Sequence, residues 1–297
     1  MLCVSLLSDK IREIKFDRTS GASKIALNAL GVLRFFVQTS KHETCRSFKE
    51  SFIEVGRKLF ETRPNMAPVQ NLVAQIAYEV GTLEEYDLAS VRKFAASRID
   101  KMYKESEVAV KKCAEWGATI IGDADCLASC SDSSTVCETF RVAKQVGKSF
   151  KVFVAESRSD DGRFRYGEVM AEFLTSIDVY AEVFPDNKIR NYVPDAKCVL
   201  VGADSVLCDG AVINGKPTAE LAVVAKECGI PFYSVCETSK VNVLNYLGKK
   251  VELKEGFDLA PANLITGLVT EKGILDANAI VEIMKTNSKY FEIFHTR

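Results

Sequence analysis

The chain has 297 residues, about twice the size of a usual single domain, so its length favours two structural units. Its 47% apolar and 27% charged residues are typical of a globular protein and exclude the disordered, collagenous and membrane-embedded classes. Because 39 basic residues stand against 40 acidic ones, overall charge gives no attraction to nucleic acid or to an anionic membrane. We expect neither as a direct partner.

Targeting segments and disulfides are not expected either. The apolar start, Met1–Leu7, has no basic region before it and is followed at once by Asp9 and Lys10, so we interpret it as neither a signal peptide nor an anchor. Most of the ten cysteines lie in apolar runs such as 197–201, where Cys acts as a small hydrophobic residue. The sequence therefore predicts free thiols and a cytoplasmic protein.

Helical periodicity dominates the first part of the sequence. Apolar residues recur at i, i+3, i+4 and i+7 from Ala22 to Val37, which predicts an amphipathic helix. Further helices are predicted over residues 45–61, 65–80 and 85–115. We expect residues 1–116 to form an all-helical domain.

After Gly117 the pattern changes to short apolar runs separated by helix-length segments. The runs predict strands over residues 118–121, 151–155, 177–183, 198–201 and 232–235, with helices between them over 133–147, 164–175 and 217–228. Nearly continuous apolar strands that alternate with helices are typical of a parallel sheet covered on both faces. We therefore expect an α/β fold in which a doubly wound sheet occupies residues 117–297, with ligands at the carboxyl ends of its strands.

Several kinds of site are not favoured. Only two histidines are present, which disfavours a catalytic triad or a histidine metal site. The segment Gly147-Lys148-Ser149 resembles the end of a phosphate-binding P-loop. It follows a predicted helix, however, and has Val142 where that loop needs its first glycine. Cys126, Cys130 and Cys137 lack the spacing that closes a zinc or iron–sulfur site. We expect no metal and no cofactor.

A hydroxyl-rich turn precedes the predicted helix at 133–147. Free backbone N–H groups and the helix dipole favour an anion there, and Ser133, Ser134 and Thr135 add donors. The alternative is that Asp132 or Ser133 only caps the helix.

Two strand ends carry further candidates. Arg158 follows the strand at 151–155 and could reach a phosphate, or it could form a surface salt bridge. Asp204 follows the strand at 198–201, where burial would raise its pKa and let it hold a proton for donation. The alternative for Asp204 is a turn or cap residue.

Two helix starts in the helical part carry an arginine. Arg18, Thr19, Ser20 and Gly21 precede the helix at Ala22, and Arg63 precedes the helix predicted over 65–80. Each alone is an ordinary cap. Together with Arg158 and the turn at 131–135 they would form a phosphate pocket if the fold brings them together.

These motifs together resemble one family: the alpha, beta and delta regulatory subunits of translation initiation factor 2B, their archaeal relatives, ribose 1,5-bisphosphate isomerase and methylthioribose 1-phosphate isomerase. The resemblance spans about residues 15–286. It implies a helical N-terminal domain, a Rossmann-like C-terminal domain and a homodimer or higher homo-oligomer. The segments that carry it are Arg18–Ala22, Arg63–Pro68, Ser133–Val136, Lys151–Arg158, Val201–Ser205, Asp209–Asn214, Ile230–Tyr233, Ala260–Pro261 and Thr270–Ile274.

The resemblance also implies a catalytic pair in the isomerases, a Cys on the hydroxyl-rich turn and an Asp in a Gly-Ala-Asp motif. Asp204 matches the Asp, whereas Ser131 stands at the Cys position. Cys130 is adjacent, but neighbouring residues of a strand point to opposite faces. A Ser hydroxyl is a far weaker acid than a thiol. Asn214 and Lys240 match ligand-side residues of the family.

This pattern favours a noncatalytic member similar to the initiation-factor proteins. Its ligand would be a sugar phosphate or a nucleoside monophosphate. Translation initiation factor 2 would be its candidate protein partner. The alternative is an aldose–ketose isomerase that uses Asp204 with Cys130 or with substrate-assisted proton transfer.

Overall fold

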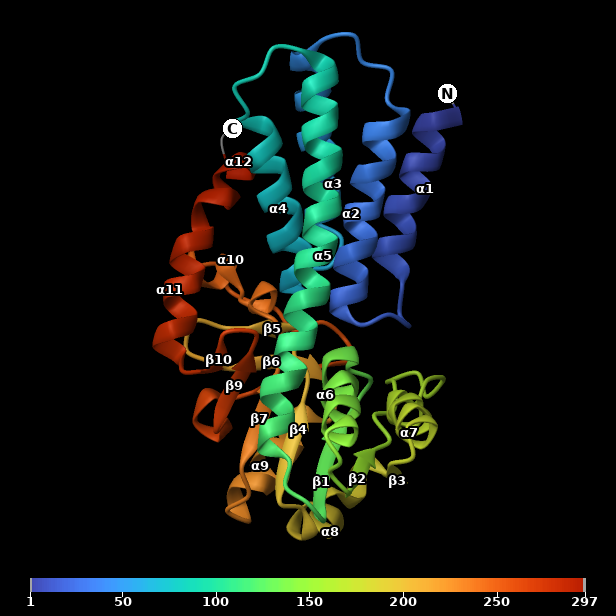
Figure 1. Cartoon of the computed structure of the whole chain (residues 1–297), viewed down its shortest axis with the longest axis vertical. Coiled ribbons are helices and arrows are strands. Elements are labelled where there is room, and N and C mark those ends of the chain that lie inside the picture. The colour runs from blue at the N-terminus through green and yellow to red at the C-terminus, as the bar shows by residue number, and fades with distance from the viewer. Residues whose placement is uncertain (1, 296–297) are drawn as a thin grey trace.

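A computed structural model describes residues 2–295 and places a bundle of long helices above an α/β part (Figure 1). The apolar stripe predicted from Ala22 is buried, and Thr44 caps the following helix by accepting a hydrogen bond from the Ser47 N–H. The helices predicted in this part are confirmed, and one more precedes them. They are α1 (Leu2–Phe16), α2 (Ala22–Thr39), α3 (Cys45–Phe60), α4 (Ala67–Gly81) and α5 (Leu88–Ile120).

Helix α5 corrects one prediction. Residues 118–120, expected with Ile121 as a strand, form the last turn of this helix, Ile121 is its C-cap, and the first strand begins only at Asp125. Ala118 and Ile121 are buried because the helix end packs on α6, where Gly117 lies against Thr139. A short apolar run looks the same in a buried helix end and in a buried strand. Since α5 passes through residue 116, the predicted domain boundary falls inside it and stays a prediction.

Seven strands form the main sheet, in the order β10-β9-β7-β4-β1-β2-β3, and only β10 is antiparallel to its neighbour. The predicted strand at 177–183 begins later, because Asp178 takes a left-handed turn with φ of 55°. The strands are β1 (Asp125–Cys130), β2 (Phe150–Ala155), β3 (Tyr180–Phe184), β4 (Cys198–Val201), β7 (Phe232–Val235), β9 (Gly267–Thr270) and β10 (Gly273–Leu275).

Helices cover both faces of this sheet, which confirms the doubly wound α/β fold. Helices α6 (Ser134–Gln145) and α7 (Tyr166–Ser176) pack with the end of α5 on one face. Helices α8 (Ile189–Tyr192) and α9 (Thr218–Glu227) pack on the other. Alternate strand residues supply the two cores, since Leu127 faces α6 and Ala128 faces α9. The carboxyl ends of the parallel strands point toward the helical bundle (Figure 1).

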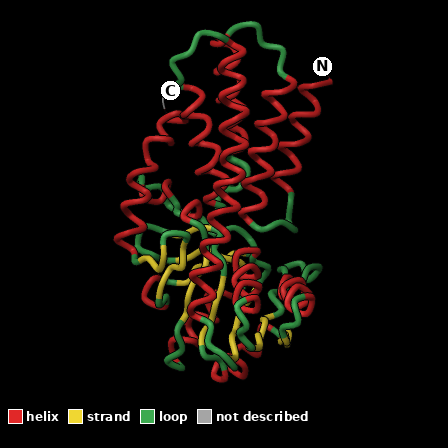
Figure 2. The backbone as a smooth tube through the Cα atoms, in the orientation of Figure 1, coloured by secondary structure: helices red, strands yellow, loops and turns green. Residues whose placement is uncertain are grey.

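A small second sheet and a helical C-terminal segment join the two parts, and neither was predicted. The sheet contains β5 (Ser205–Val206), β6 (Val212–Gly215) and β8 (Phe257–Ala260). Helix α10 (Val243–Tyr246) lies between β6 and β8 in the chain, and helices α11 (Ala277–Asn287) and α12 (Glu292–His295) form the C-terminal segment (Figure 2). Phe291 packs edge-on against Phe60 and Phe294 packs tilted against it, at centroid distances of 5.6 and 4.9 Å, so the end of the chain belongs to the core of the bundle.

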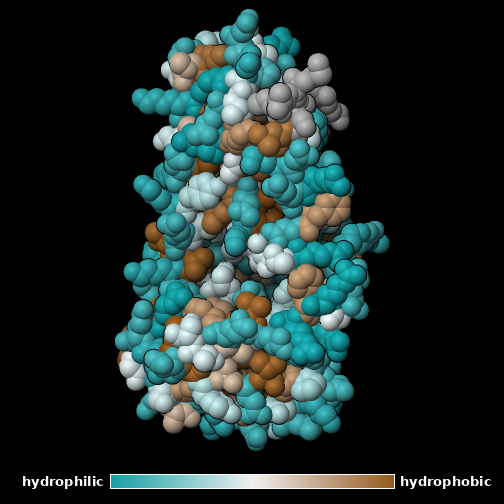
Figure 3. Space-filling model, turned by 90° about the vertical axis from the view of Figure 1, so that its right-hand side faces the viewer, coloured by the Kyte–Doolittle hydropathy of each residue, from teal (hydrophilic) through white to brown (hydrophobic). Residues whose placement is uncertain are grey.

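The described residues also allow three observations on cysteines, metal-ligating side chains and membrane spans. The nine cysteines among them that follow Cys3 are free thiols, and no His, Cys, Asp and Glu side chains there gather in a metal-binding group of three or more. Within the same residues, no helix is long and apolar enough to cross a membrane. Figure 3 shows one side of the molecule, on which hydrophilic residues predominate and hydrophobic ones are scattered.

Candidate functional site

A cavity of about 520 Å³ lies between the helical bundle and the carboxyl ends of the strands. Its lining combines seven Lys and Arg side chains with five Asp and Glu and many hydroxyl groups. The structure brings most of the predicted site residues to this one place. They are Arg18, Thr19, Ser20, Gly21, Arg63, Ser131, Ser133, Ser134, Arg158, Asp204, Asn214 and Lys240.

The hydroxyl-rich turn is shaped by backbone geometry at the end of β1. Ser131 has a left-handed φ of 63°, and its N–H donates to Ser157 Oγ at 2.6 Å. Ser133 then caps α6 by accepting a hydrogen bond from the Val136 N–H at 3.4 Å. Ser131, Ser133 and Ser134 line the cavity, so the capping role and a ligand-binding role are compatible.

The cap gives a testable effect on stability. Replacing Ser133 with alanine leaves the Val136 N–H without its side-chain partner and is expected to cost about 1 kcal/mol of unfolding free energy. Urea unfolding followed by circular dichroism measures this loss. An unchanged midpoint would show that the cap does not stabilise α6.

Two of the predicted residues are set back from the cavity. Cys130 is fully buried among the side chains that pack on α9, and its Sγ lies 3.3 Å from Thr218 Oγ1. Burial raises the pKa of the Cys130 thiol to about 12. Thr135 is also buried, and its hydroxyl donates to Glu237. The left-handed turn at Ser131 separates the Cys130 side chain from the cavity.

The start of α2 is organised by Asp17. Its Oδ1 accepts the N–H groups of Thr19 and Ser20, both at 2.9 Å, and the Thr19 hydroxyl. The hydroxyl of Tyr166, at the start of α7, donates to the Arg18 carbonyl at 2.9 Å. These bonds fix the segment that carries Arg18 over the strand ends.

Arg63 comes from the turn before α4. Its Nη1 donates to the Lys15 carbonyl at 3.2 Å and its Nε lies 3.3 Å from Met66 Sδ. Neither contact neutralises the guanidinium. This half-buried cation therefore lines the cavity with guanidinium N–H groups that remain available to a ligand.

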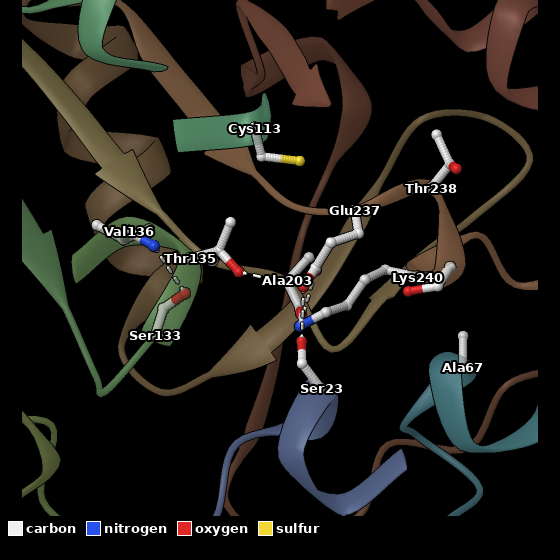
Figure 4. Close-up of polar contacts among 12 residues, drawn as sticks. Ser23, Ala67, Cys113, Ser133, Thr135, Val136, Ala203, Glu237, Thr238 and Lys240 are labelled. Atoms are coloured by element: carbon white, nitrogen blue, oxygen red, sulfur yellow. Dashed lines mark hydrogen bonds and ion pairs between the residues drawn. The ribbon is translucent and has the colours of Figure 1, made fainter. Parts of the chain in front are cut away.

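Asp204 and Lys240 lie at the inner end of the cavity. Burial raises the pKa of Asp204 to about 6, although the nearby Lys240 and Arg63 oppose the shift. The Lys240 ammonium donates to the Ala203 carbonyl at 2.6 Å, as Figure 4 shows. Asn214, from β6, is held by a 3.0 Å hydrogen bond to Thr218. Asp204 can exchange a proton near neutral pH.

Sequence reasoning missed several residues of this site. Lys254 lines the cavity, and Lys216 does so while paired with Asp160 at 2.9 Å. Asn65, from the turn that carries Arg63, binds the backbone of residues 252 and 254 through both ends of its amide. Lys216 and Lys254 lie in loops beside the unpredicted small sheet, so no local pattern marked them. Asn65 lies in a turn that was singled out for Arg63, but its contacts join residues far apart in the chain.

A model of the initiation factor 2 subunit family matches residues 18–256. The chain belongs to this family. The match includes every predicted site residue that lines the cavity. It also agrees with the resemblance inferred from the motifs.

Individual relatives of both kinds are found. The translation initiation factor eIF-2B subunit 2-like protein of Pyrococcus furiosus is 31% identical, covering 89% of this chain and 94% of the relative. The ribose 1,5-bisphosphate isomerase of the same organism is 27% identical, and the match covers 94% of this chain and 92% of the isomerase. The family thus joins initiation-factor proteins and a sugar-phosphate isomerase.

Solved structures share the fold. The eIF-2B of Pyrococcus horikoshii OT3 superposes with a TM-score of 0.78 at 27% identity and covers 91% of this chain and 96% of its own. The tetrameric eIF2B-beta2-delta2 complex of Chaetomium thermophilum gives a TM-score of 0.81 at 17% identity, covering 96% and 95%, which is a likeness of fold alone.

Proposed function

We propose that this protein is a noncatalytic member of its family that binds a sugar phosphate or a nucleoside monophosphate in the cavity. The observation that carries the proposal is the chemistry of the lining. Side chains suited to binding phosphate converge there, and no thiol belongs to the described lining. By the resemblance of its motifs, Ser131 stands at the position of the isomerase cysteine. A pocket can keep its affinity for a ligand after losing an acid that only the reaction needs.

Two helix starts support binding of an anion. The first turns of α2 and α6 both open on the cavity, and each presents backbone N–H groups. Arg63 and Lys240 add positive charge to the lining of the same cavity. Such an arrangement fits one phosphate group well, and the remaining volume suits a ribose or a nucleoside.

The thiol that stands beside Ser131 does not restore the chemistry. Cys130 is buried on the α9 side of β1, and its pKa of about 12 holds the thiol protonated. It is therefore neither placed nor poised to exchange a proton with a molecule in the cavity.

The regulatory role is proposed from the relatives. The 31% identical relative is named for initiation factor eIF-2B, and a solved relative forms a beta2-delta2 tetramer. We infer that this chain forms a homodimer or higher homo-oligomer and binds translation initiation factor 2 in the cytoplasm. Light scattering tests the oligomer. A pull-down that recovers no initiation factor would contradict the partner.

Binding is tested by a thermal shift of the purified protein. Ribose 1,5-bisphosphate and adenosine 5′-monophosphate (AMP), each at 100 times its dissociation constant, would stabilise the fold by about 2.7 kcal/mol. Ribose and adenosine without phosphate are the matched controls and are expected to give no shift. The same melting temperature with and without both phosphates would contradict the proposal.

A second candidate, an aldose–ketose isomerase, is favoured by one observation. Asp204 lies in the cavity with a pKa of about 6, which suits a group that transfers a proton near neutral pH. Turnover of ribose 1,5-bisphosphate that is abolished by Asp204→Asn would establish this reaction. Turnover that survives the substitution would exclude this role for Asp204.

A further inference from the structure

Glu237 lies directly behind the wall of the cavity and joins its two helix starts. Its side chain is 2% exposed. Oε1 accepts hydrogen bonds from Ser23 Oγ at 3.0 Å and from Thr135 Oγ1 at 3.4 Å. Ser23 stands in the first turn of α2 and Thr135 in the first turn of α6, so one carboxylate oxygen connects the helical part with the sheet part (Figure 4).

The second carboxylate oxygen faces Lys240. Oε2 accepts no hydrogen bond within the described part of the chain, and the Lys240 ammonium lies 3.9 Å away. That ammonium instead donates to the Ala203 carbonyl at 2.6 Å. Because an ammonium has three donors, Lys240 retains donors for an anion in the cavity that it lines.

We propose that Glu237 is the built-in counter-ion of Lys240 and that it limits how tightly the cavity binds anions. This inference rests on the proposed function. A buried ammonium is costly unless negative charges compensate it. Asp204 also lies near Lys240, and Glu237 adds to this compensation and so stabilises the empty cavity. A bound phosphate offers Lys240 a second negative charge, and the two negative groups repel each other at close range. By thermodynamic linkage, the Glu237 carboxylate weakens binding of the anion, and a bound anion weakens the pair of Glu237 and Lys240 to the same extent.

The consequence is a higher threshold for occupancy of the cavity. Glu237 lowers the affinity for every anion by a similar factor, so charge alone holds a simple anion weakly. A ligand must add contacts from its sugar or base to be retained. Those contacts, and not Glu237, set the ratio of affinities between phosphate esters and inorganic phosphate.

Isothermal titration calorimetry with inorganic phosphate and with AMP tests this at fixed pH. Glu237→Gln keeps the size of the side chain and an oxygen that accepts from Ser23 and Thr135, but removes the charge. The variant is expected to bind both probes about tenfold more tightly than wild type, and to melt at a lower temperature without them. Glu271→Gln is the matched control, since Glu271 is a neighbouring carboxylate that bonds Thr238 instead of Lys240. We expect it to bind the probes as wild type does.

Unchanged or weaker binding by Glu237→Gln, with wild type binding normally, would overturn the inference and leave the proposed function standing. If neither protein binds either probe, the inference about Glu237 and the proposed function are both contradicted. Binding by Glu237→Gln alone would support the inference.

A second measurement tests the pairing of Glu237 with Lys240 in the absence of ligand. Lys240→Met and Glu237→Gln combined should lower the melting temperature by less than the sum of their separate effects. Additive effects would contradict the pairing.

Discussion

Replacing Arg63 with methionine is expected to weaken binding of a phosphate ligand about 30-fold. Arg63 is a cation that the helical part contributes with its donors largely free, and a hydrogen bond to a charged group contributes about 2 kcal/mol. Methionine keeps most of the apolar volume of the side chain but none of the charge. Calorimetry with AMP measures the dissociation constant directly.

The matched control for this change is Arg46→Met. Arg46 is exposed on α3 and pairs only with Glu50 among the described residues, so its loss should leave the dissociation constant unchanged. Circular dichroism shows whether each variant is folded. Equal affinities of wild type and Arg63→Met would contradict the placement of the phosphate beside Arg63.

Replacing Asp204 with asparagine is expected to stabilise the ligand-free protein by about 3 kcal/mol at pH 8. The folded state holds the pKa of Asp204 at about 6, whereas an unfolded Asp titrates near 3.9. Between these values the folded state binds the extra proton, so the stability due to protonation is present below about pH 4 and is lost as the pH rises through 6. Asparagine cannot ionise, so the variant does not lose this part of the unfolding free energy as the pH rises.

Urea unfolding at pH 4 and at pH 8 tests this sign. The Asp204→Asn protein should match wild type at pH 4 and exceed it at pH 8. Asp195→Asn, a change of an exposed carboxyl group, should follow wild type at both values. A lower stability of Asp204→Asn at pH 8 would mean that the carboxylate is stabilised in the fold, which contradicts the effect of burial assigned here.

The fold could be predicted from the sequence wherever a periodic pattern was long. The helix from Ala22 and the strand Cys198–Val201 are each buried as their patterns indicate. The prediction of a strand at 118–121 was wrong because that run is too short to separate a strand from a helix end. The small sheet and the C-terminal helices depend on contacts across the chain, such as Phe291 on Phe60.

The candidate site was predicted where a residue stands at a strand end or a helix start. Arg18, Arg63, Arg158 and Asp204 meet at one cavity because the helical bundle sits on the carboxyl ends of the strands. Glu237 could be suspected only from its spacing before Lys240. Its bonds to Ser23 and Thr135 join residues far apart in the chain, which no local pattern can show.

Phosphorus NMR of ribose 1,5-bisphosphate mixed with the protein tests the central claim most directly, because one sample reports binding and turnover together. We expect its phosphate resonances to shift or broaden as protein is added, with the same two signals still present after prolonged incubation. New resonances of a ketose bisphosphate that accumulate with time, and that Asp204→Asn abolishes, would contradict the noncatalytic role. Unperturbed resonances for this compound and for AMP would contradict ligand binding itself.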